Sequence, residues 1–189
     1  MFASEQQGFT LVEFVVIISI FAIIAAISLF NFSGFNSNIS LSNLTHDIAL
    51  VIRDAQVSGI SGQSTNDPEN PIPRGVYFEY NSGFSSDIII FDDFDEDELY
   101  QSNTEEVDTI TIQTADTIAS IETGTSSANA NSCTNGGGVR IFFKRPDPNP
   151  IVYCGNGSPV SFARINVVAS DGSDTRSIEI YPTGQINIE

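Results

Sequence analysis

The chain of 189 residues is poor in the side chains that most catalytic and metal sites need, with no Trp, one His, one Met and two Cys. A single His leaves little room for acid–base or metal chemistry built on imidazole. Two Cys exclude a zinc module of the four-thiolate kind. We therefore expect no enzyme. A signal-anchored enzyme would need a concave site with perturbed titratable groups, which this sequence does not indicate.

Basic residues are also scarce. The chain has 7 Lys and Arg and 24 Asp and Glu, which gives a net charge of -17. Nucleic-acid binding needs clustered cations, and the only basic cluster is Arg140, Lys144 and Arg145. Cations on strands pair readily with local acids, so no nucleic-acid partner is expected. The length suggests one domain, and 41% hydrophobic residues exclude a disordered acidic tail.

Residues 14–30 form one long apolar run, FVVIISIFAIIAAISLF, without a charged side chain. At about 1.5 Å per residue the run spans roughly 26 Å, and its extension to residues 9–32 is long enough to cross an apolar core about 30 Å thick. A secretory signal needs a positive leader and a small-x-small cleavage site. Residues 1–8 contain no Lys or Arg, and NFSGFNSN follows the run. The run therefore predicts a membrane-spanning helix rather than a secretory signal.

The pattern changes twice after this run. Apolar residues at steps of three and four, from Ile39 to Ala55, predict one helix from about Phe9 to about Gly59 with an amphipathic second half. Beyond it the period becomes two, and the expected strands are GVYFEY, DIIIF, TITIQ, VRIFF, ARINVVA, SIEIY and QINI. No connection is both long enough and helical enough for a parallel crossover. The predicted fold is α+β: a long N-terminal α-helix, half transmembrane and half amphipathic, packed on an antiparallel β-sheet or β-sandwich.

A short motif, GFTLVE at residues 8–13, stands directly before the apolar run. It joins a hydrophilic leader to Gly8, Phe9 and, four residues later, Glu13. With these residues in this order the chain resembles the type IV prepilins. The resemblance implies that a prepilin peptidase cuts between Gly8 and Phe9 and that Phe9 is then N-methylated.

Glu13 needs an explanation, because a carboxylate near hydrocarbon costs about 2.5–3.5 kcal/mol on insertion scales. Cleavage would give Phe9 an α-amino group with a reference pKa near ~7.7–8.0, mostly cationic at neutral pH. Stacking of helices with an axial offset would bring one subunit's amine to Glu13 of its neighbour, an assembly role. The alternative is that Glu13 lies solvated in the headgroup layer.

The rest of the chain resembles the H-type minor pseudopilins of type II secretion and the related fimbrial T-type minor pilins, at IRDAQ (52–56), GVYF (75–78) and IYPTGQI (180–186). The resemblance implies a leader (1–8), a transmembrane and filament-core helix (9–33), an amphipathic helix half (34–62) and a β-rich head (63–189). The implied location is the bacterial inner (cytoplasmic) membrane, with a single pass and the head outside the cytoplasm, and then the pilus or pseudopilus. The implied partners are the prepilin peptidase/methylase, other pilin or pseudopilin subunits and the inner-membrane assembly platform.

An acidic stretch, FDDFDEDELY, occupies residues 91–100. Asp93, Asp95 and Asp97 alternate like the first ligands of an EF-hand loop, but Glu98 stands where that loop needs glycine. The stretch is either a solvated turn or a looser Ca²⁺ loop. We expect no other cofactor.

Cys133 and Cys154 flank a predicted hairpin with a Pro-rich tip. A head outside the cytoplasm permits a disulfide, and cross-strand partners come within the Cα distance that a disulfide needs. We therefore expect a Cys133–Cys154 bridge, and the alternative is two free thiols.

Two hypotheses for the function follow. In the first, the chain is a structural minor subunit of a type IV pilus or a type II secretion pseudopilus, assembled through its N-terminal helix. In the second, it is a ligand-binding module for calcium, DNA uptake or a secreted substrate, displayed on such a stem. A DNA receptor would need a contiguous basic face.

Overall fold

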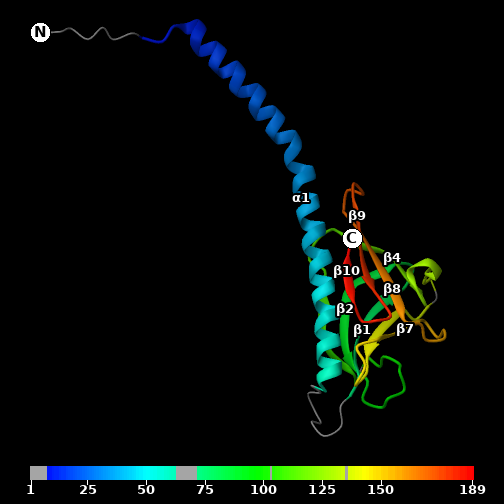
Figure 1. The fold of residues 1–189 in the computed structure, drawn as a ribbon. Helices are drawn as coiled ribbons and strands as arrows, with labels where there is room; N and C mark the ends of the chain where they lie inside the picture. The colour runs from blue at the N-terminus through cyan, green and yellow to red at the C-terminus, as the bar shows by residue number, and fades with distance from the viewer. Residues whose placement is uncertain (1–7, 63–71, 103, 135) are drawn as a thin grey trace, which may run out of the picture. The chain divides into compact units, whose positions relative to one another are not determined.

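The computed structural model describes residues 8–62, 72–102, 104–134 and 136–189, without the side chains of residues 29–35. One helix, α1 (Leu11–Ser61), precedes all the strands (Figure 1). The chain divides into two compact units, Met1–Ser37 and Asn38–Glu189. The second unit, called the head below, contains the amphipathic half of α1 together with the strands.

Both ends of α1 lie within two residues of the sequence prediction. The helix ends at Ser61 because Gly62 has a φ of 71° and its N–H donates to the carbonyl of Ser58 at 3.1 Å, which is a left-handed C-terminal cap. In the amphipathic half, the predicted apolar stripe is buried and the charged residues between its members are exposed. Ile39 is the exception, since it is 44% exposed and lies outside the core.

The strands form two antiparallel five-stranded sheets. The first sheet has the order β3 (Glu106–Thr111), β2 (Phe84–Asp92), β1 (Arg74–Tyr80), β6 (Val139–Phe143) and β7 (Pro150–Cys154). The second has the order β10 (Ile186–Ile188), β9 (Thr175–Ile180), β8 (Phe162–Val168), β4 (Thr117–Gly124) and β5 (Asn131–Ser132). A short 3-10 helix, Ser127–Asn129, connects β4 to β5. The α+β class with antiparallel sheets is therefore confirmed.

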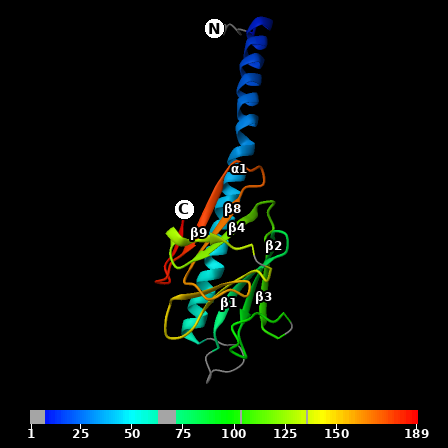
Figure 2. The ribbon, with the colours of Figure 1, turned by 90° about the vertical axis from the view of Figure 1, so that its right-hand side faces the viewer.

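The C-terminal half of α1 lies along the strands (Figures 1 and 2). One core joins the helix to both sheets; its members include Leu41, Ile48, Ile52, Val76, Phe78, Ile141, Phe143, Ile121, Ile165 and Ile178.

Gln56 is a buried polar residue of α1 that bonds to two loops. Its Nε2 donates to the carbonyls of Pro148 (2.9 Å) and Gly184 (2.8 Å). Gly184 has a φ of 80°, and a Cβ there would strike the Pro148 carbonyl. Glycine is thus required where the helix meets this turn.

The sequence prediction missed β4, and the reason is a break in its periodicity. Ile118 and Ile121 both lie in the core, although they are three residues apart. The pairing of β4 with β8 shifts register between Ile118 and Ser120. Such an extra residue turns the following side chains to the other face. A search for strict alternation therefore could not find this strand.

The disulfide between Cys133 and Cys154 is present, with a Cα–Cα distance of 5.7 Å. The predicted pairing is confirmed, but the expected geometry was wrong, because the two residues are not cross-strand partners in one hairpin. Cys154 ends β7, and its partner in the ladder with β6 is Val139. Cys133 follows β5, at the edge of the other sheet. The bridge therefore links the edges of the two sheets.

Removing this bridge should destabilise the head. We expect the variant Cys133→Ala/Cys154→Ala to lose about 3 kcal/mol of unfolding free energy, because a loop of this size gains that much chain entropy when it is opened. Denaturant unfolding of the full chain in detergent measures the loss, and reduced wild-type protein provides the matched control. A loss of less than about 1 kcal/mol in both the double variant and the reduced wild type would contradict a stabilising role for the disulfide between the sheets.

Candidate functional site

The N-terminal end of α1 is fixed by a side-chain cap. Thr10 directly precedes the helix, and its Oγ1 accepts a hydrogen bond from the backbone N–H of Glu13 at 3.2 Å. Its carbonyl accepts the N–H of Phe14, also at 3.2 Å. A Thr followed three residues later by Glu, just before an apolar run, is the signature of a capping box. The sequence interpretation did not single out Thr10, although this signal was available.

The cap keeps the predicted cleavage site outside the helix. Gly8 and Phe9 have no helical or strand assignment and are exposed. A Cβ placed on Gly8 would meet nothing within 4 Å. The Gly8–Phe9 peptide bond thus lies in accessible, non-helical chain, the form in which proteases bind a substrate.

Glu13 lies in the first turn of α1 and is exposed. A negative side chain at a helix N-terminus interacts favourably with the helix dipole. Glu13 is also the only charged side chain from residue 8 to residue 28. In the described N-terminal unit it therefore forms the one ionic group available for recognition along the apolar helix.

The first half of α1 presents apolar side chains on all sides. Leu11–Ser28 has a mean hydropathy of 2.7, none of it is buried, and by length and composition it could cross a membrane. Phe9, Leu11 and Phe21 are each more than 70% exposed. Ser19 donates its hydroxyl to the carbonyl of Val15 at 2.8 Å, which satisfies a polar group inside the run. An apolar surface of this extent needs lipid or other chains to cover it.

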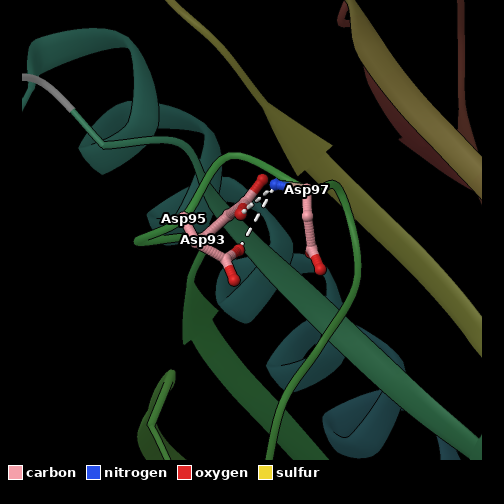
Figure 3. A group of neighbouring side chains, drawn as sticks. All are labelled: Asp93, Asp95 and Asp97. Carbon is pink, nitrogen blue, oxygen red and sulfur yellow. Dashed lines mark hydrogen bonds between the residues drawn. The ribbon is translucent and has the colours of Figure 1, made fainter.

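The acidic loop (residues 93–102) brings the three predicted metal ligands together. One carboxylate oxygen from each of Asp93, Asp95 and Asp97 lies within 4.8 Å of the others (Figure 3). Asp93 is buried, whereas Asp95 and Asp97 are exposed. Glu98 adopts a φ of 64°, the left-handed conformation that an EF-hand obtains from glycine.

The carboxylates of this loop already accept hydrogen bonds from the loop itself. Asp93 accepts the N–H groups of Asp97 (3.1 Å) and Glu98 (3.2 Å). The side-chain amide of Gln101 donates to Asp95 at 2.9 Å and to Asp97 at 3.1 Å. These bonds stabilise the turn without an ion, as the solvated-turn alternative requires. Calcium binding at this loop stays a prediction.

Aromatic and charged contacts hold the acidic loop against the first sheet. Tyr100 stacks on Tyr77 with ring centroids 4.7 Å apart, and burial, followed by its hydrogen bond to Glu106, raises the pKa of Tyr100 to about 12. The hydroxyl of Tyr153 donates to Glu98. Burial also raises the pKa of Asp93. The loop therefore has a defined shape on the sheet.

The structure does not bring the three predicted basic residues to one surface. Arg140 is 5% exposed and lies against the ring of Tyr153, 5.1 Å from its centroid. Lys144 pairs with Glu96 of the acidic loop at 3.0 Å. Arg145 is exposed in the turn after β6. Among the described residues, this sequence cluster thus does not form a contiguous basic face.

Residues 4–29 match the family model described as the prokaryotic N-terminal methylation motif. The matched segment includes Gly8, Phe9 and Glu13 together with the apolar helix. No curated protein and no solved structure matches the chain. The N-terminal segment is therefore the part that connects this chain to known proteins.

The buried carboxyl of Glu105, next to the acidic loop, predicts a pH dependence of stability. Burial, with the charge of Asp93 nearby, raises its pKa to about 6 from an ordinary 4.5. The folded state therefore binds this proton more tightly, and the contribution of Glu105 to stability falls as the pH rises from about 4.5 to about 6. Relative to Glu105→Gln, the wild type should lose about 2 kcal/mol between about pH 4 and pH 7.

Denaturant unfolding of both proteins across this pH range measures the effect. Glu106→Gln is the matched control, since it removes one negative charge from the exposed neighbour. A difference between wild type and Glu105→Gln that does not change with pH would contradict the assignment.

Proposed function

We propose that this chain, whose N-terminal segment is that of a type IV pilin-like prepilin, is a minor subunit of a type IV pilus or of a type II secretion pseudopilus. One observation carries the proposal: an exposed Gly8–Phe9 bond lies outside a capped helix whose first eighteen residues, Leu11–Ser28, are apolar and uncovered by the described chain. The role is structural, and the partners are other subunits.

The first step is processing at the membrane. A prepilin peptidase hydrolyses the Gly8–Phe9 bond, which consumes one water and leaves a carboxylate on Gly8 and an amine on Phe9. The enzyme then transfers a methyl group from a methyl donor to that amine, which loses a proton. The Thr10 cap supports this step because it holds the helix start at Leu11, beyond the cleaved bond.

The second step is recognition between subunits through Glu13. The amine of Phe9 is mostly cationic at neutral pH, with a reference pKa near ~7.7–8.0. Next to hydrocarbon its attraction to a neighbour's Glu13 is strong, although desolvation offsets much of the net gain. The pair therefore selects the axial register of the helices more than it adds stability.

The third step moves α1 from lipid into a bundle of helices. Its apolar surface is compatible with both surroundings, and Ala22, Ala25 and Ala26 permit close approach of neighbouring backbones. The inner-membrane assembly platform drives this transfer. The head lies outside the cytoplasm of the bacterial inner membrane, where the Cys133–Cys154 disulfide persists.

Processing can be tested by substitution of Gly8. We expect Gly8→Ala to leave an uncleaved precursor, because a side chain obstructs the peptidase at the bond that it must bind. Misfolding would not explain the result, since a Cβ at Gly8 meets nothing within 4 Å. Gly83→Ala, which also places a Cβ in open space, is the matched control. Mass spectrometry that finds the normal methylated Phe9 terminus in Gly8→Ala would overturn the cleavage assignment.

Assembly can be tested by substitution of Glu13. We expect Glu13→Ala and Glu13→Gln to remain in the membrane but to fall at least about tenfold in sheared filaments, which needs a difference of only ~1.4 kcal/mol. Ser19→Ala removes another polar group of the same helix and should assemble normally. Immunoblots of membrane and filament fractions, with immunogold labelling, give the result. Normal filament content in Glu13→Gln would exclude the charge-pair mechanism.

A further inference from the structure

The exposed large apolar side chains of the described head lie in two places. One set, Ile39, Leu50 and Val57, is on α1, and the other, Phe94, Leu99 and Val107, is in or beside the acidic loop. Leu50 and Val57 are the most exposed of these, at 66% and 54%. Exposed apolar side chains that gather in this way mark interaction surfaces.

Two members of the set on α1, Leu50 and Val57, border a groove of about 690 Å³, called the helix groove below. Leu50 and Val57 line it from the helix, and Ile186 and Ile188 line it from β10, the edge strand of the second sheet. The carbonyl of Gln185 accepts the N–H of Tyr181, directly after β9, and the N–H and carbonyl of Glu189 both bond to Ser177 in β9. In an antiparallel ladder the intervening Ile186 and Ile188 therefore direct their peptide groups away from β9. The groove thus combines apolar walls with an open strand edge.

The helix groove differs in charge from the chain as a whole, which is strongly negative. Its ionisable lining residues are His46 and Arg53, and no carboxylate lines it, although the chain carries a net charge of -17. Arg53 donates to the side chain of Gln56 at 2.5 Å, and within the described residues it makes no ion pair. In contrast, Arg74 and Arg164 pair with carboxylates at 2.6–2.7 Å. The charge of Arg53 thus remains available to a partner.

The acidic loop has the complementary chemistry. Its exposed Phe94 and Leu99 flank Asp95, Glu96 and Asp97, which are also exposed. Contacts of Tyr100 and Tyr153 hold the loop in shape on the first sheet, so docking costs little conformational entropy. The loop and the C-terminal half of α1 lie on different sides of the head (Figure 1). A loop therefore reaches a groove only on another molecule.

We infer that the helix groove is the docking site for the acidic loop of a second copy of this chain. Phe94 and Leu99 cover Leu50 and Val57, and the carboxylates of the loop face Arg53. Because the two surfaces differ, the contact is heterologous and leaves a free groove and a free loop at the ends, which suits growth of a filament. This inference deepens the proposed function and rests on it. The contact needs only two copies of the chain, so it is compatible with the role of a minor subunit.

Site-directed photo-crosslinking of the processed full chain in detergent tests the contact. With Leu50→p-benzoylphenylalanine, irradiation should give a covalent dimer whose crosslinked peptide, identified by mass spectrometry, contains residues 93–102. The yield should fall as salt rises, because the contact is partly ionic. Crosslinking of Leu50 to detergent or lipid alone, or to another segment of the partner copy, would overturn the inference.

A charge exchange separates recognition from folding. Arg53→Glu, combined with the crosslinker, should lower the dimer yield at least fivefold, whereas Arg176→Glu, which makes the same charge change on β9 outside the groove, should not. Mixing the Arg53→Glu copy with an Asp95→Lys/Glu96→Lys copy should restore the yield. Failure of this rescue with both variants folded by circular dichroism would contradict the pairing. If processing and Glu13-dependent assembly are normal but the crosslink does not form, the docking of the loop in the groove is rejected and the proposed function is not. If the crosslink forms but the chain is not processed, the proposed role in a filament is rejected.

Discussion

The constraint on which the rest depends is an apolar helix surface that its own chain does not cover. Leu11–Ser28 is apolar throughout and buries none of its length within the described structure. In water such a surface would drive aggregation, so it must lie in lipid or against other helices. The two environments are chemically similar, and one helix can therefore be a membrane anchor first and a filament core later. The Thr10 cap, the exposed Gly8 and the single acid Glu13 all lie at the N-terminal end of this helix.

The head meets a different constraint, since it must stay folded with a large excess of negative charge. It does so with a core shared by α1 and both sheets, with the disulfide that joins two sheet edges, and with local satisfaction of its acids. Asp93 accepts backbone N–H groups, and Arg74 pairs with the buried Asp92. These contacts limit the repulsion between the negative charges of the head. No carboxylate lines the helix groove, whereas the chain as a whole carries a net charge of -17.

Sequence reasoning was most reliable where one physical signal dominates. The apolar run and the following stripe placed α1 to within two residues at each end, and the match to the methylation motif confirmed the prepilin resemblance. It failed where tertiary structure changes a local rule. The bulge in β4 puts Ile118 and Ile121 on one face and hides the strand from a search for alternation. Ile39 fits the apolar stripe but is exposed and lies outside the core.

The sequence by itself determined the helix, the processing motif, the antiparallel character of the strands and the identity of the disulfide partners. These depend on hydropathy, spacing and the number of Cys, which are local properties or simple counts. Only the tertiary structure decided that the disulfide joins the two sheets and that Arg140 is buried against Tyr153 while Lys144 pairs with the acidic loop. It also decided that Leu50, Arg53 and β10 line one groove. Each of these depends on which distant segments the packing brings together, and side-chain pattern along one segment contains no information about its neighbours in space.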